Sequence, residues 1–117
     1  MSIVWPYPAP VDDGRACHLV KRLAVPDVDL PAHDGSRIAI ARLRHPAVLF
    51  IYPWTGRPGL ANPPNWDEIA GAHGSTPEVE GFRNLHSGFA ASGVSVFGLS
   101  NQPSDWHAEL AARLSLP

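Results

Sequence analysis

Two apolar runs separated by a helical pattern constrain the fold of this chain more than any other feature. The first, PAVLFIYP, spans residues 46–53 and is bounded by prolines; the second, VSVFGLS, spans residues 94–100. Between them, TPEVEGFRNLHSGFAASG (76–93) repeats apolar residues at helical spacing and ends in Ser-Gly. Short continuous apolar runs are typical of strands buried on both faces. A strand, a helix and a second strand therefore predict two adjacent parallel strands with a right-handed crossover.

Patterns outside this unit add a hairpin and a final helix. VPDVDLPAHDGSRIAIARL (25–43) predicts two short strands around an HDGS turn. PSDWHAELAARLSLP (103–117) predicts a helix that begins at Ser104 or Asp105 and keeps Leu110 on its apolar face. The predicted order is an N-terminal β-hairpin followed by β-α-β-α, which is an α/β fold. Sites in such sheets lie beyond the carboxyl ends of the strands.

Prolines and glycines crowd two segments of the chain. The sequence has 13 prolines and 10 glycines, gathered mainly in the first ten residues and between Pro53 and Pro77. The first cluster predicts an extended surface arm at residues 1–13, with Trp5 and Tyr7 as its anchors, ahead of a domain at 14–117. The second predicts a long loop, and a long connection of this kind is usually functional when it occurs.

Composition excludes several classes of partner. The 117 residues are 44% hydrophobic and 17% charged, with a net charge of −2, so the chain is globular and carries no extended basic cluster. We therefore expect no nucleic acid and no anionic membrane as partners. The apolar runs are too short to span a bilayer, and the N-terminus does not have the pattern of a secretory signal. Cys17 is the only cysteine, which excludes an intrachain disulfide and favours a reducing cytoplasm.

The segment GAHGSTPEVEGFR (71–83) aims one hydroxyl, that of Ser75, from a glycine turn into the start of a helix. Ser75 and Glu78 match a capping box, in which the serine bonds the amide three residues on and the glutamate reaches back. A Ser-dependent hydrolase is a weaker interpretation, because the surrounding residues do not form a nucleophile elbow. His73 is too close in sequence to act as a base without strain, and Asp67 and Glu68 could orient it only by chance.

No metal and no cofactor is expected from the sequence. The six histidines form no paired helical or cysteine-rich ligand set, and His33 with Asp34 is more typical of a turn than of a metal site.

Three segments together resemble a known family. AVLFIYPWTGRPG, PNWDEIAGAHGSTPEVEGFR and GVSVFGLSNQPSDWHAELAARLSLP agree in order and spacing with peroxiredoxins of the thioredoxin-fold AhpC/TSA superfamily. The chain is most similar to the Q-type, or bacterioferritin-comigratory, branch with a proline-rich insert, and the resemblance extends from about residue 12 to the end. It implies a thioredoxin-like sandwich. Such relatives continue past LSLP, so the resemblance also implies a C-terminally truncated domain with an open sheet edge at residues 94–99.

The resemblance assigns roles to individual positions. In those relatives the helix start reads approximately Gly-Cys-Thr-Pro-Gln-Ser-Cys-x-Phe-Arg, so Ser75 stands where the peroxidatic cysteine is found. Glu80 stands at the position of the resolving cysteine. Thr55 is the candidate for the hydroxyl placed near peroxide, although relatives without the insert place it where this chain has Ala72. The remaining matches, at the strand end and the helix start, are Pro53, Gly74, Thr76, Pro77, Phe82 and Arg83.

Serine cannot perform the family's chemistry. Thiolate attacks the peroxide O–O bond, a helix N-terminus stabilises that thiolate, and a second thiol reduces the resulting sulfenic acid. The resemblance thus implies a scaffold that is inactive as written, with peroxide and a thioredoxin-like thiol reductant as partners only if cysteine is restored. An engineered replacement and natural divergence both account for Ser75, and Glu80 favours divergence.

Two further expectations concern partners. A homo-oligomer or a complementing chain would cover the open sheet edge at 94–99. The alternative function is a non-catalytic redoxin-fold module that binds a ligand or partner in the old pocket. Cys17, near Arg15, His18 and Lys21, is expected to be an incidental thiol.

Overall fold

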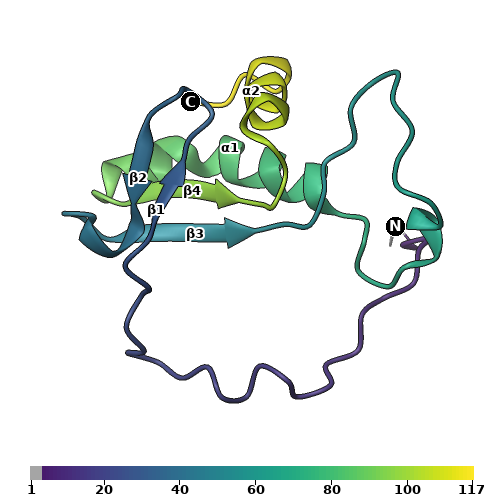
Figure 1. Cartoon of the computed structure of the whole chain (residues 1–117), viewed down its shortest axis with the longest axis horizontal. Coiled ribbons are helices and arrows are strands. Elements are labelled where there is room, and N and C mark those ends of the chain that lie inside the picture. The colour runs from purple at the N-terminus through teal and green to yellow at the C-terminus, as the bar shows by residue number, and fades with distance from the viewer. Residues whose placement is uncertain (1–3) are drawn as a thin grey trace.

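The predicted parallel pair is present in the computed structural model, which describes residues 4–117. Strand β3 (Ala47–Ile51) runs parallel to β4 (Ser95–Leu99), with Ala47 opposite Ser95 and Ile51 opposite Leu99. Helix α1 (Ser75–Ala91) lies between them in sequence and packs on β4. Figure 1 shows that α1 begins at the end of the molecule toward which both strands point. The sequence prediction of a β-α-β unit is therefore confirmed.

Burial on both faces, predicted for these strands, is wrong. The side chains of β3 and β4 are half-buried at most positions, and Ile51 is 70% exposed. The reason is that full burial requires neighbouring strands and a packed layer on each face. Within the part of the chain that the structure describes, β4 pairs with β3 alone, and α1 is the helix that packs extensively on it. The open edge predicted at residues 94–99 is thus present among residues 4–117.

The hairpin forms a separate two-stranded sheet. Strands β1 (Asp29–Pro31) and β2 (Arg37–Ala39) pair antiparallel around the predicted turn. In that turn, the Asp34 carboxylate accepts hydrogen bonds from the Ser36 amide at 2.9 Å and hydroxyl at 2.6 Å. The second strand is shorter than predicted, because the 3₁₀ turn η1 (Ile40–Arg42) replaces its last residues.

Helix α2 (Ser104–Arg113) closes the core. It begins at Ser104, as predicted, but its N-cap is Pro103 and no side chain caps it. Leu110 is fully buried against Tyr52 and Val79, and these three residues form the centre of the core. The fold is accordingly mixed α/β, the class predicted from the sequence.

The proline-rich segments follow two different courses. The loop from Tyr52 to Gly74 carries one short 3₁₀ helix, η2 (Trp66–Glu68). In the predicted arm, residues 4–13 form no helix or strand, and residues 1–3 lie outside the described part. The Tyr7 ring stacks on the His73 ring with the centroids 3.6 Å apart, so Tyr7 anchors the arm as predicted. Trp5 is half-exposed, and the one aromatic ring that it meets in the described residues is that of Tyr7, in a T-shaped arrangement.

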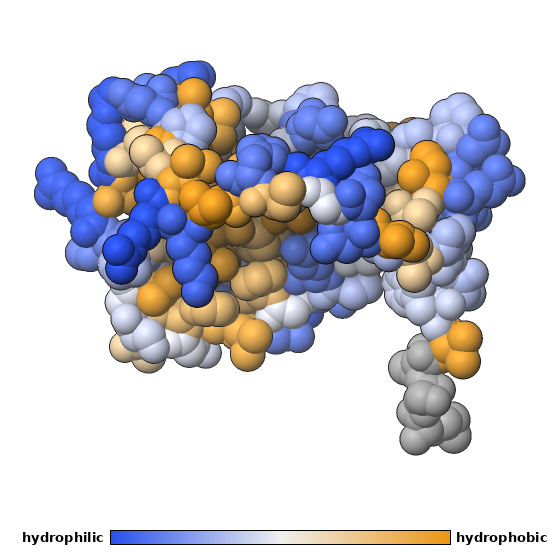
Figure 2. Space-filling view, turned by 90° about the horizontal axis from the view of Figure 1, so that it is seen from below, coloured by the Kyte–Doolittle hydropathy of each residue, from blue (hydrophilic) through white to orange (hydrophobic). Residues whose placement is uncertain are grey.

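The segment after the arm sweeps widely below the sheet (Figure 1). Figure 2 shows apolar and hydrophilic side chains mixed over the face seen from below. More than half of the surface of Leu19, Val20, Leu23 and Val25 is exposed. Within residues 4–117, no helix is both long and apolar enough to cross a membrane.

Gly98 on β4 provides a test of the strand packing. It lies opposite Phe50, and a Cβ atom added there would come within 2.7 Å of the Phe50 ring and 3.2 Å of the Tyr52 ring. We expect Gly98→Ala to lower the free energy of unfolding by about 1–3 kcal/mol, because the core would be overpacked. Urea denaturation followed by circular dichroism measures this change.

The matched control is Gly88→Ala on α1, where an added Cβ would meet no atom within 4 Å. It should raise stability by about 0.5–1 kcal/mol, the difference in helix propensity between the two residues. Equal effects of the two substitutions would contradict the packing described here.

Candidate functional site

Buried hydrogen bonds between Thr55 and Gln102 join the two loops at the carboxyl ends of β3 and β4. The Thr55 amide and hydroxyl both donate to Gln102 Oε1, at 3.2 and 3.1 Å. The Gln102 Nε2 amide donates back to the Thr55 carbonyl at 3.2 Å, and Trp106 Nε1 donates to the same carbonyl at 3.0 Å. Thr55 is completely buried. Its hydroxyl, which was predicted to lie near peroxide, therefore donates its hydrogen bond to Gln102.

Ser75 is the first residue of α1, and its side chain is almost completely buried. It is 4% exposed, and its Oγ has no hydrogen-bond partner among residues 4–117. The predicted capping box is wrong: the N-cap is Gly74, with φ of 108°, and the helix starts without a side-chain cap. The reason is the left-handed backbone of Gly74, which moves the start of the helix one residue earlier than a serine cap requires.

The other positions at the helix start lie as an ordinary first turn would place them. Thr76 and Pro77 follow Ser75 within α1, and Pro77 is exposed. Glu80 lies on the same helix but about 140° further round its axis than Ser75, given 100° per residue. Pro53 is exposed just after β3. Partial burial raises the pKa of Glu78, in the first turn of the helix.

The histidine nearest to Ser75 in sequence is engaged elsewhere. His73 Nε2 lies 2.7 Å from an Asp67 carboxylate oxygen, and its ring is stacked on Tyr7. The histidine that a Ser75-dependent hydrolase would require is absent from hydrogen-bonding range in the part of the chain that the structure describes.

Neither a metal-ligand cluster nor a buried thiol is found among residues 4–117. Across residues 4–117, no group of three or more His, Cys, Asp or Glu side chains could hold a metal ion. Cys17 is exposed in the segment below the sheet.

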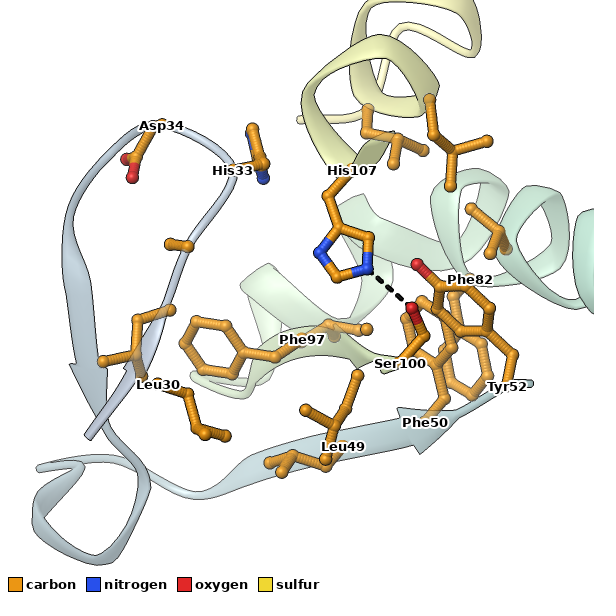
Figure 3. A pocket seen from close by; sticks show the side chains of 18 of the residues that line it. Leu30, His33, Asp34, Leu49, Phe50, Tyr52, Phe82, Phe97, Ser100 and His107 are labelled. Atoms are coloured by element: carbon orange, nitrogen blue, oxygen red, sulfur yellow. Dashed lines mark hydrogen bonds between the residues drawn. The ribbon is translucent and has the colours of Figure 1, made fainter. Parts of the chain in front are cut away.

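A second polar group, not predicted from the sequence, lies at the same ends of the strands. Ser100 follows β4, and its Oγ lies 2.6 Å from Nε2 of His107 on α2 (Figure 3). The backbone amide of Gln102 donates to the same Oγ at 3.3 Å. The serine oxygen thus accepts from the Gln102 amide, and its proton has two acceptors within reach, the imidazole nitrogen at 2.6 Å and Gln102 Oε1 at 3.4 Å.

Burial keeps the groups beside Ser100 uncharged. Desolvation, assisted by nearby His33, lowers the pKa of His107. Burial raises the pKa of Tyr52, whose hydroxyl lies beside Ser100; the hydrogen bond with Ser100 opposes this shift, and the charge of Glu78 adds to it. The imidazole and the phenol are both neutral near pH 7.

The sequence held a signal for this group. SNQPSDWH (100–107) places serine, glutamine and histidine directly after a predicted strand, where sites in α/β sheets lie. The sequence interpretation concentrated on Thr55 and the Ser75 helix and assigned no role to Ser100, Gln102 or His107.

No protein-family model matches this chain, and no curated protein matches it.

The unpartnered Ser75 hydroxyl leads to a prediction about stability. A buried hydroxyl without a hydrogen bond loses its hydration without compensation, at a cost of about 1–3 kcal/mol. We expect Ser75→Ala to raise the free energy of unfolding by about 1 kcal/mol or more. Urea denaturation measures it, and Ser87→Ala is the control, because Ser87 is exposed on the same helix and should gain only about half a kcal/mol from helix propensity. A loss of stability in Ser75→Ala would show that the hydroxyl is satisfied in solution.

The depressed pKa of His107 predicts a pH dependence of stability. The unfolded chain binds a proton at His107 near the ordinary pKa, about 6.5, whereas the folded chain resists protonation. The stability due to neutral His107 is therefore complete above the unfolded value and is lost as pH falls through the folded value. The wild-type chain should lose more stability between pH 7.5 and 5.5 than His107→Asn does.

Urea denaturation at both pH values gives this difference. His45→Asn is the control, because His45 is exposed, and it should keep the wild-type pH dependence. The other titratable groups along the same cavity, His33, Asp34, Tyr52, Arg83 and His86, are present in both variants. Because His33 interacts with His107, the difference between wild type and His107→Asn reports the titration of His107 together with its interaction with His33. An unchanged pH dependence in His107→Asn would contradict the lowered pKa.

Proposed function

We propose that this chain is a peroxiredoxin-like scaffold with a thioredoxin-like fold, in which Ser75 occupies the position of the peroxidatic cysteine. The environment of Ser75 is the observation that carries this proposal: a buried oxygen with no partner, at the first position of a helix of 17 residues. A hydroxyl is poorly suited to that place. A thiol is better suited, because it is a small hydrophobe when protonated and is stabilised by the helix N-terminus when ionised.

The arrangement of the surrounding elements also supports the proposal. A β-α-β unit with a long loop before the helix brings the first turn of α1 to the carboxyl ends of the strands (Figure 1). Gly74 lets the chain turn sharply into that helix. The segment of Pro53 and Thr55 leaves β3 at the same end, with Thr55 held in place by Gln102.

As it stands, the chain is not a peroxidase. In a thiol peroxidase the thiolate sulfur attacks one peroxide oxygen, the O–O bond breaks, and hydroxide leaves while the sulfur becomes sulfenic acid. Two equivalents of thiol then reduce the sulfenic acid, giving a disulfide and water. Serine offers no accessible anion near neutral pH and no reversible oxidation, and Glu80 cannot act as a resolving thiol.

A second function, binding without catalysis, is favoured by a separate observation. An open cavity of about 340 Å³ lies between the hairpin and the parallel sheet, and Ser75 does not line it. A binding role for this cavity does not depend on chemistry at position 75.

Restoring the sulfur tests the peroxidase lineage. We expect Ser75→Cys, in a Cys17→Ser background that leaves one thiol, to consume hydrogen peroxide in the presence of dithiothreitol. The helix N-terminus should lower the thiol pKa from about 8.5 toward 7, so that the thiolate fraction at pH 7 rises about tenfold over that of an ordinary cysteine. Peroxide consumption and dimedone trapping of the sulfenic acid, read by mass spectrometry, provide the two measurements.

The wild-type chain, with Cys17 alone, is the matched control, because its thiol is exposed but lies outside the proposed site. A cysteine at position 75 that reacts no faster than Cys17, in a variant whose circular dichroism and urea denaturation show an intact fold, would overturn the proposal.

A further inference from the structure

The cavity between the hairpin and the parallel sheet has the size and lining of a small-molecule site. Its volume of about 340 Å³ falls at the lower end of the range of about 300–1,000 Å³ that is typical of ligand sites. The hairpin contributes one wall, β3 and β4 the floor, and the helices and the last residues the remaining side (Figure 3). The apolar part of the lining includes Leu30, Ile38, Leu49, Val96 and Phe97.

The polar groups of the cavity converge on one corner. Ser100 and His107 form their 2.6 Å hydrogen bond there, and the Tyr52 side chain points toward the same place (Figure 3). Gln102 orients Ser100 through its backbone amide. Apolar walls with one convergent polar corner are the usual construction of a site that fixes a ligand by a single head group.

This corner favours an uncharged head group. His107 and Tyr52 are both held neutral by burial, so neither provides a charge for an ion. Arg83 in the lining donates to the Leu114 carbonyl at 3.1 Å, and exposed Asp34 binds Ser36. The two remaining histidines of the lining, His33 and His86, form no hydrogen bond with Ser100 or His107. An ionic head group would lose its hydration in the corner without a matching charge.

We propose that this cavity binds a small uncharged molecule, with an apolar ring or chain between the hairpin and the sheet and one hydroxyl or carbonyl group hydrogen-bonded at Ser100 and His107. The imidazole Nε2 accepts from a ligand hydroxyl when the Ser100 proton turns away, and the Ser100 hydroxyl donates to a ligand carbonyl. The inference specifies the ligand of the second, binding function and rests on it, but it is independent of the proposed peroxidase lineage, because it uses neither Ser75 nor any redox step.

A bicyclic alcohol tests the proposal. We expect 2-naphthalenemethanol to bind the wild-type chain saturably in an NMR titration, with the amide shifts centred on Gly98 and Ser100. Naphthalene, which lacks the head group, and 2-naphthoate, which is charged, should each bind at least about threefold more weakly, the net effect of one hydrogen bond. This selectivity is read on the wild-type chain and requires no variant to fold.

Variants then assign the preference to the polar corner. Ser100→Ala and His107→Asn should weaken alcohol binding about three- to tenfold and leave naphthalene binding nearly unchanged. The matched controls are Ser95→Ala and His73→Asn, because neither residue lines the cavity, and both should bind the alcohol as the wild-type chain does.

Three results would overturn the proposal. One is the absence of saturable binding, and another is binding that does not distinguish the alcohol from naphthalene and naphthoate. The third is a dimer, detected by light scattering, in which the β4 edge of one copy fills the cavity of the other and excludes the probe. The occupant of the cavity would then be a second copy of the chain. Shifts centred on residues outside the cavity count as an absence of binding at the site.

Discussion

The parallel pairing of β3 with β4 is the constraint on which the rest of this structure depends. Parallel strands end at the same edge of a sheet, so the two segments of the chain that follow β3 and β4 start side by side. Here the backbone continues the ladder by one further bond, from the Tyr52 amide to the Leu99 carbonyl at 3.1 Å. Directly beyond it, the side-chain amide of Gln102 accepts a hydrogen bond from the Thr55 N–H through its oxygen and donates one to the Thr55 carbonyl through its nitrogen. The polar groups of the candidate sites are positioned by this junction, by α1 that connects the strands, or, for His107, by α2 that follows β4.

The sequence predicted most of the elements because their signals are local. Apolar runs, an HDGS turn and a helical period are each readable within a window of a few residues, and β3, β4, the hairpin and both helices followed from them. The strands were expected to be buried because continuous apolar runs are typical of central strands covered on both faces. The described chain contains no third strand beside β3 and β4, so the free edge of β4 stays open, and Ile51 is 70% exposed.

The errors at the sites have a different physical origin. Whether Ser75 caps α1 depends on the backbone conformation of the preceding residue, Gly74, whose φ is 108°. Because glycine adopts positive and negative φ about equally well, the residue pattern does not predict this value. The contact of Thr55 with Gln102 depends on the relative placement of two loops, and that of Ser100 with His107 depends on how α2 packs at the end of β4. Such placement is set by strand register and helix packing, which short-range patterns do not report.

The two candidate sites share one wall, which makes their electrostatics interdependent. Tyr52 lies in the core beside Val79, one helical turn after Ser75, and its ring also lines the cavity that holds Ser100 and His107. The charge of Glu78 already raises the pKa of Tyr52. A thiolate at position 75 would add a second negative charge close to Glu78 and so raise the pKa of that carboxyl further. Neutral Ser75 removes this repulsion between the helix start and Glu78. Tyr52 is neutral in either form, because a nearby negative charge raises the pKa of a phenol, so the adjacent cavity presents the same uncharged wall whether position 75 carries serine or a thiolate.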